Sequence, residues 1–178
     1  MSRRLWTVGH STLPFEGFAS LLEGHAIQLL CDVRTVPRSR RHPQFSTEAL
    51  AGSLQDRGID YRHLAGLGGW RHPHADSPNA AWRNSSFRGY ADYALSPEFA
   101  QALSELCALA LRRRAAIMCA EALWWHCHRR LIADRMLAAG WEVWHIGSDG
   151  RASPHRLPPF AVIQPDASVI YPGAVTLL

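Results

Sequence analysis

Short apolar runs alternate with amphipathic segments along most of the chain, and this alternation restricts the possible folds more than any other feature. The runs that we expect to form strands are residues 5–8, 27–33, 59–64, 115–118 and 141–146. The segments between them carry apolar residues at three-to-four spacing, which is typical of helices with one buried face. Strands that alternate with helices form a parallel sheet covered on both faces. We therefore predict an α/β fold: a single three-layer domain with a mostly parallel five-stranded sheet and helices on both faces.

The periodic segments predict helices at residues 14–23, 46–57, 96–113 and 129–139. Residues 65–94 show no sustained periodicity, and irregular segments of this length are usually functional or disordered. Residues 1–147 are expected to form the α/β domain. Residues 148–178 are rich in proline, and we expect them to pack on this domain as an extension, with a possible hairpin between residues 161–163 and 168–170.

A polar or reactive side chain lies at or just beyond the carboxyl end of each predicted strand. These side chains are, in strand order, His10, the pair Asp32 and Arg34, His63, Cys119 and His145. Ligands of parallel α/β sheets bind beyond the carboxyl ends of the strands. The sequence therefore predicts a functional site at this edge of the sheet.

The stretch from Cys119 to Arg129 joins the fourth predicted strand to a helix. The free N–H groups at a helix N-terminus favour an anion and stabilise a thiolate. Cys119 and Cys127 are therefore candidate catalytic residues, with a redox pair, metal ligands or buried structural thiols as alternatives. Their spacing matches no zinc motif, so we predict no metal site. Glu121 and His10 are candidates for acid–base catalysis.

Apart from histidine, the basic residues are 19 arginines, and the chain contains no lysine. This excludes a lysine Schiff base and a lysine-bearing phosphate loop. Arginine binds phosphate in a bidentate manner, and four arginines follow the second predicted strand within residues 34–41. The net charge of +4 permits nucleic-acid binding without requiring it. The predicted ligand-binding residues are Asp32, Arg34, Arg38, His63, Tyr90, His128 and Arg129.

Several short motifs carry a resemblance to a known family. They are residues 7–11, 31–34, 37–40, 43–45, 61–64, 67–69, 90–93, 118–121 and 127–129. On these residues the chain resembles the bacterial and archaeal family called domain of unknown function 488, from the first predicted strand to about Ile146. That family has no settled activity, so the resemblance implies a map of the site and no reaction.

A weaker likeness connects Asp32, Arg34, Cys119 and Arg129 with rhodanese-type sulfurtransferases, in which a cysteine carries a persulfide.

Three hypotheses about the function follow from these patterns. The leading one is an enzyme with an anion-binding site for a nucleotide, a nucleic acid or another phosphate-bearing substrate. The alternatives are a rhodanese-like sulfurtransferase and a non-catalytic nucleic-acid-binding module. The sequence does not indicate a cofactor or an oligomeric state.

No apolar run approaches the roughly 20 residues that span a bilayer, and the N-terminus does not resemble a signal peptide. We therefore expect a cytoplasmic protein with no membrane partner. Cysteines of cytoplasmic proteins rarely form structural disulfides, so free thiols are expected at all four positions.

Overall fold

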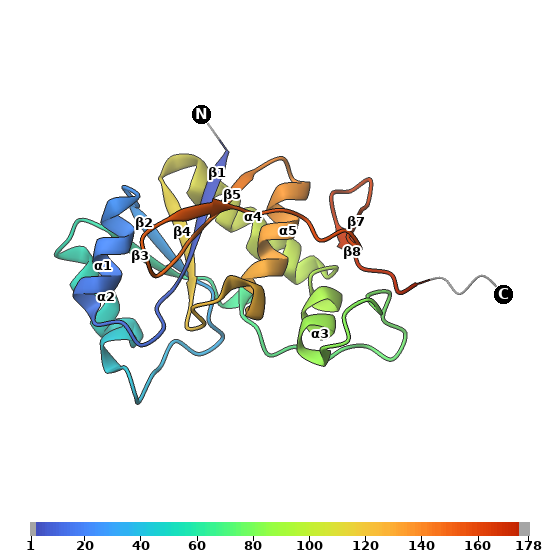
Figure 1. Cartoon of the computed structure of the whole chain (residues 1–178), viewed down its shortest axis with the longest axis horizontal. Helices are drawn as coiled ribbons and strands as arrows, with labels where there is room; N and C mark the ends of the chain where they lie inside the picture. Colours follow the sequence, from blue (N-terminus) through green and yellow to red (C-terminus); the bar gives the residue numbers. More distant parts are fainter. Residues whose placement is uncertain (1–2, 175–178) are drawn as a thin grey trace.

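The computed structural model describes residues 3–174 and confirms the α/β fold class (Figure 1). A six-stranded sheet has the order β3-β2-β4-β1-β5-β6, and every neighbouring pair is parallel except β5 and β6. The strands are β1 (Arg4–Gly9), β2 (Leu29–Asp32), β3 (Asp60–His63), β4 (Ala115–Cys119), β5 (Glu142–Ile146) and β6 (Ala152–Pro154). The five predicted strands therefore all form, and a short antiparallel strand extends the sheet.

Helices cover both faces of the sheet, because successive side chains of its buried strands point to opposite sides. Leu30, Ala116 and Met118 contribute to a core beneath α1 (Phe15–Gly24) and α2 (Thr47–Gln55). Cys31 and Ile117 face the other core, beneath α4 (Pro97–Arg112) and α5 (Arg129–Ala138). Figure 1 shows α1 and α2 on one side of the strands and α5 on the other.

The prediction for residues 65–94 missed a helix. Helix α3 (Ser85–Tyr93) forms in this stretch, and the Asn84 side chain caps it by accepting hydrogen bonds from the backbone N–H groups of Ser86 and Phe87. The helix is short and its exposed face is polar, so its apolar residues are too few to establish a helical period. Short 3-10 helices add further order at η1 (Pro43–Phe45), η2 (Ala65–Leu67) and η3 (Trp124–His126).

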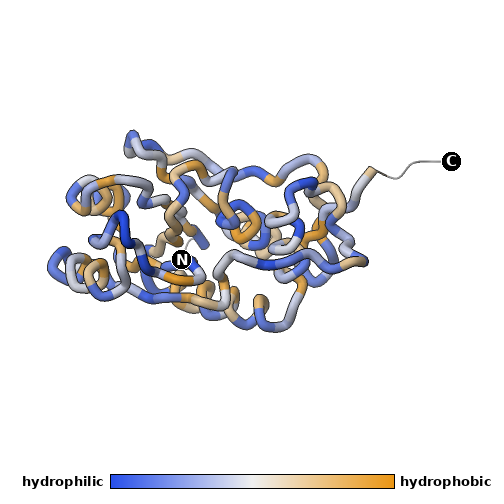
Figure 2. Tube along the Cα trace, turned by 90° about the horizontal axis from the view of Figure 1, so that it is seen from below, coloured by the Kyte–Doolittle hydropathy of each residue, from blue (hydrophilic) through white to orange (hydrophobic). Residues whose placement is uncertain are grey.

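The proline-rich extension contributes to the core as well as to the surface. Its predicted hairpin forms from β7 (Val162–Ile163) and β8 (Val169–Ile170). Tyr171 is buried and its hydroxyl donates a hydrogen bond to Asp134 of α5. In the hydropathy-coloured trace, polar and apolar positions alternate along the elements (Figure 2). Residues 175–178 of the predicted extension lie outside the described range.

No helix within residues 3–174 combines the length and apolar character needed to cross a membrane. The four cysteines, which all lie in this range, are free thiols.

Candidate active site

Strands β1 and β4 lie side by side at the centre of the sheet, and the chain leaves them toward opposite faces. Such a switch point opens a crevice beyond the strand ends. The backbone N–H of His10 donates to the carbonyl of Cys119 at 3.0 Å, which joins the two loops there. A Cβ atom at Gly9 would lie 2.0 Å from the carbonyl oxygen of Glu121, so only glycine lets the second loop cross the end of β1.

A cavity of about 940 Å³ occupies this crevice and collects most of the predicted site residues. The predicted residues that line it are His10, Arg34, Arg38, Tyr90, Cys119, Glu121, Cys127 and His128. Asp32, His63 and Arg129 lie behind the lining and contact it. The structure therefore brings together segments that are more than a hundred residues apart in the sequence.

Cys119 and Cys127 both line the cavity, and each sulfur accepts a hydrogen bond from Arg129. Burial raises the pKa of the Cys119 thiol, and the hydrogen bond to Cys127 raises it further. Burial opposes ionisation of Cys127 too, but hydrogen bonds from Cys119 and His128 and the charge of Arg129 lower its pKa well below the ordinary range. Within this pair the surroundings therefore favour ionisation of Cys127 over ionisation of Cys119.

The start of helix α5 supplies the groups that favour this thiolate. The backbone N–H of Arg129 donates to Cys127 Sγ at 3.5 Å. His128 Nε2 donates to the Val33 carbonyl at 2.8 Å. Nδ1 of the same ring lies 3.6 Å from Cys127 Sγ and donates to that sulfur when the ring is an imidazolium with both nitrogens protonated. The helix dipole adds to the same effect, because its positive end lies at this residue.

Arg129 is almost completely buried, and no carboxylate pairs with it anywhere in residues 3–174. Its Nε donates to Cys119 Sγ at 3.2 Å and its Nη2 donates to the carbonyl of Glu121 at 2.5 Å. Burying a guanidinium is costly unless an anion and hydrogen-bond acceptors surround it. The acceptors around the guanidinium are Cys119 Sγ, the Thr7 hydroxyl and the carbonyls of Glu121 and Ala122, so an ionised sulfur of the pair can balance the charge of Arg129.

A chain of buried hydrogen bonds continues behind Arg129. Arg129 Nη1 donates to Thr7 Oγ1 at 3.2 Å, and Thr7 Oγ1 lies 2.7 Å from His145 Nδ1. His145 Nε2 lies 2.9 Å from His155 Nδ1, and His155 Nε2 lies 2.6 Å from Asp134 Oδ1. Burial and the nearby His155 and Arg129 lower the pKa of His145 to about 2, so His145 is neutral.

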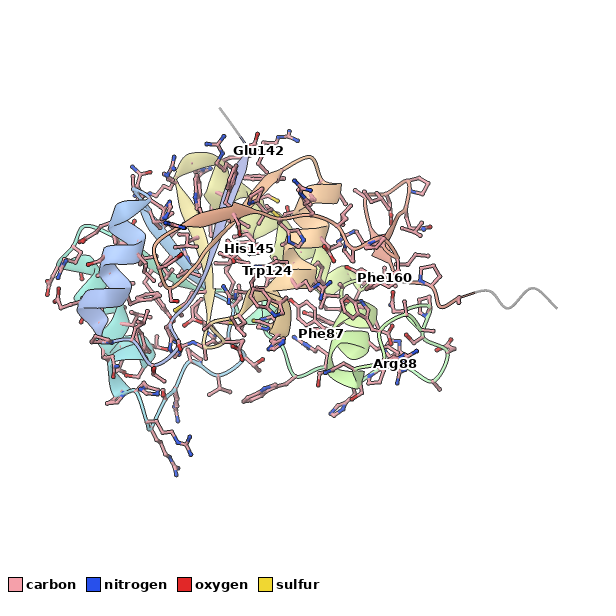
Figure 3. The ribbon with its side chains drawn as sticks, viewed as in Figure 1. Phe87, Arg88, Trp124, Glu142, His145 and Phe160 are labelled. Atoms are coloured by element: carbon pink, nitrogen blue, oxygen red, sulfur yellow. The ribbon has the colours of Figure 1, made fainter. Side chains whose placement is uncertain are left out.

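The two ends of this chain set the direction of every bond in it. Arg129 can only donate, so the Thr7 hydroxyl proton is left to bond His145 Nδ1. His145 then donates from Nε2 to His155, which donates from its own Nε2 to Asp134. The ring of Trp124 stacks on the His145 ring at a centroid distance of 4.0 Å and so packs against this row of hydrogen bonds. Figure 3 labels the two residues, which lie next to each other.

His10 and Arg34 form the opposite wall. His10 Nδ1 donates to the Ser11 carbonyl at 2.8 Å, so the lone pair of Nε2 faces Arg34 Nη1 at 3.4 Å. Burial and the charge of Arg34 lower the pKa of His10 to about 4. Asp32 holds Arg34 through Nε at 2.9 Å and Nη2 at 2.6 Å, and Tyr61 donates to the same carboxylate.

The other predicted residues divide into those that reach the cavity and those that brace it. Arg38 is exposed at the mouth, as are Arg40 and Arg41. Tyr90 is buried, donates to the Leu67 carbonyl and presents its ring to His128. His63 bonds the Arg34 carbonyl at 2.8 Å and so supports the loop without lining the cavity.

Glu121 lines the cavity from the loop after β4. Its carboxylate accepts the backbone N–H of Leu123 at 3.0 Å, and its carbonyl accepts from Arg129. Among residues 3–174, no group of three or more His, Cys, Asp or Glu side chains is arranged to hold a metal ion.

A family model described as "Domain of unknown function DUF488" matches residues 14–136, which is more than half of the chain. The chain belongs to the DUF488 family. Searches of curated proteins and of solved structures found no significant match. The DUF488 match contains both cysteines, His128 and Arg129, whereas His10 lies before it.

Part of the site comes from outside the DUF488 match, and of this part the sequence indicated His145 alone. Thr7 precedes the matched range, and His145, His155 and Tyr171 follow it. Thr7, His155 and Tyr171 carried no local signal, since each lies in a short strand or in the proline-rich tail. Asp134 did carry one, because a carboxylate on the inward face of an amphipathic helix needs a buried partner.

Proposed function

We propose that this protein is a thiolate-dependent enzyme that acts on a phosphate-bearing substrate bound in the cavity. One observation carries the proposal: the buried, carboxylate-free guanidinium of Arg129 contacts a thiol pair that opens on a basic cavity. Perturbed ionisation of a nucleophile within a cavity is the usual mark of a catalytic site. A module that only binds nucleic acid would gain nothing from such a thiolate.

The proposed chemistry divides the work between the two sulfurs. The Cys127 thiolate attacks an electrophilic centre of the substrate, and the bond from that centre to the leaving group breaks. Cys119, whose pKa burial keeps high, donates its proton to the leaving group, and Arg129 stabilises the sulfur that remains. Neutral His10 can then accept a proton from the water that releases the product.

Positive charge at the mouth favours the phosphate. Arg34 Nη1 faces inward, because Asp32 occupies its other nitrogens, and Arg38 stands on the loop that follows. Glu121 is the carboxylate that lines the same cavity. Arginine clusters with few carboxylates bind phosphate groups through charge-assisted hydrogen bonds.

Alkylation with iodoacetamide tests the thiolate, with peptide mass mapping to identify the modified cysteine. We expect Cys127 to react at pH 7, and inorganic phosphate to slow the reaction by occupying the cavity. Cys107 is the matched internal control, because burial raises its pKa and it lies outside the cavity. Equal modification of both cysteines, or none at Cys127 below pH 8, would refute the proposal.

A second test uses turnover of a panel of phosphate esters, including p-nitrophenyl phosphate and nucleoside phosphates. Cys127→Ser should abolish turnover and Cys107→Ser should leave it unchanged. Full activity of the Cys127→Ser variant would remove the thiolate from the mechanism.

Sulfur transfer is the second candidate, and the neighbouring Cys119 thiol favours it. The Cys127 thiolate would attack the outer sulfur of thiosulfate, with formation of a persulfide and departure of sulfite. Intact-mass measurement after thiosulfate exposure should then show a gain of one sulfur atom in the wild type and none in Cys127→Ser. An unchanged mass of the wild-type protein would exclude this reaction.

A further inference from the structure

We infer that Trp70 is the stacking platform for the base of a nucleotide whose phosphate lies in the cavity, an inference that rests on the proposed function. Trp70 lines the cavity mouth, yet 80% of its surface is exposed. Trp6, Trp82 and Trp141 are all buried in the cores. A large aromatic ring left in solvent at the rim of a charged cavity is suited to a planar ligand.

The backbone holds Trp70 in this position against its own preference. Its φ of +59° lies in the left-handed region, which bulky residues rarely adopt. Residues in such conformations persist where the surrounding structure fixes them, and they concentrate at ligand sites. Ser11 has a φ of +48° and lines the same cavity.

Contacts on both sides of Trp70 fix the bend. Thr35 Oγ1 donates to the Gly69 carbonyl at 2.9 Å. A Cβ atom at Gly68 would lie 2.6 Å from Thr35 Oγ1, so this position also requires glycine. The guanidinium of Arg71 lies over the Tyr93 ring at 3.6 Å from its centroid. Because Thr35 belongs to the loop that carries the arginines, Trp70 and that loop keep a fixed relationship.

Charge complementarity identifies the other half of the ligand. Arg38, Arg40 and Arg41 are exposed, line the cavity and form no ion pair with any residue in the range 3–174. Guanidinium groups beside an aromatic face provide the two contacts that a nucleotide requires: charge for its phosphate and a surface for its base. The ligand is therefore either a free mononucleotide or one unit of a single strand, which share this chemistry.

The experiment measures binding of inorganic phosphate, adenosine monophosphate and a short single-stranded oligoadenylate by calorimetry. The proteins are the wild type, Trp70→Ala, Trp70→Phe and the matched control Trp125→Ala, whose ring is 44% exposed and lies outside the cavity lining. We expect Trp70→Ala to weaken binding of the monophosphate by about 5- to 150-fold. Phosphate affinity should stay the same, Trp70→Phe should recover part of the loss, and Trp125→Ala should match the wild type.

The ligands separate the possible outcomes. Equal affinities of the oligoadenylate and the monophosphate identify a mononucleotide site, and a much tighter oligoadenylate identifies a strand; both support Trp70 as the platform. Unchanged monophosphate affinity in Trp70→Ala, or wild-type binding of phosphate as tight as that of the monophosphate, overturns the inference and leaves the proposed function standing. Failure of phosphate to bind or to slow alkylation of Cys127 overturns the proposed function itself.

Discussion

Replacing Thr7 with valine tests whether the buried chain of hydrogen bonds supports the thiolate. Valine keeps the shape of threonine and removes the hydroxyl, so it breaks the bond from Arg129 Nη1 at 3.2 Å and the bond to His145 Nδ1 at 2.7 Å. Each buried polar group left without a partner costs roughly 1 to 3 kcal/mol. The variant should therefore lose about 2 to 6 kcal/mol of unfolding free energy.

Thr7→Ser is the matched control, because serine retains the hydroxyl and loses one methyl group. Removing one methyl group from a core costs about 1 kcal/mol. Urea unfolding should therefore rank the wild type above Thr7→Ser, and Thr7→Ser above Thr7→Val. The full transition must be measured, since this loss is a large part of the 5 to 15 kcal/mol that typically stabilises a domain.

The same variants should change the ionisation of Cys127. Arg129 is less firmly held in Thr7→Val, so it stabilises the thiolate less, and the pKa of Cys127 should rise toward its ordinary value. The rate of iodoacetamide modification as a function of pH measures this shift, which a purely structural role of Thr7 would not produce. A Thr7→Val protein with wild-type stability, or with an unchanged pH profile, would refute the reasoning.

Three further predictions concern backbone strain and pH. Gly9→Ala should lower the free energy of unfolding by about 3 kcal/mol or more, because its Cβ would overlap a backbone carbonyl of the crossing loop. The control Gly52→Ala lies in open space on helix α2 and should raise the free energy of unfolding by about 0.5 to 1 kcal/mol; both are measured by chemical unfolding. Trp70→Gly and the control Ala26→Gly should each raise the free energy of unfolding by about 1 kcal/mol, because glycine relieves the strain of a left-handed backbone. Only Trp70→Gly should also weaken nucleotide binding. Equal stability of Trp70→Gly and the wild type would contradict the strain. The pKa of His10 is about 4 in the folded protein, which is below its value in the unfolded chain, so the unfolded chain binds the proton first as the pH falls. The free energy of unfolding should therefore decrease from pH 6.5 toward pH 4, by up to about 1.4 kcal/mol per pH unit for this one group. His10→Gln should flatten this slope in urea unfolding, and an identical slope would show that His10 does not cause it.

The sequence was sufficient to predict the parallel sheet because its apolar runs and helical periods depend on local burial. The same argument placed His10, Arg34 and Cys119 at one edge, and the structure brings these three residues to one cavity. Strand β6 escaped prediction because it pairs along one edge only and its side chains are mostly exposed, so it needs no apolar pattern.

Arg129 shows what the sequence could not supply. Its position at a helix start suggested a phosphate ligand, whereas its side chain turns inward to Thr7 and Cys119. That direction depends on the pairing of β1 with β4, whose partners are separated by more than a hundred residues. The exposure of Trp70 and its positive φ likewise depend on tertiary contacts that no local pattern records.

The proline-rich extension has a consequence for the synthesis of this protein. Asp134 receives hydrogen bonds from His155 and Tyr171, both of which are translated after every residue of the cavity. While these two residues remain in the ribosomal exit tunnel, Asp134 lacks both of these hydrogen bonds, and the buried row of bonds behind Arg129 ends without its last support.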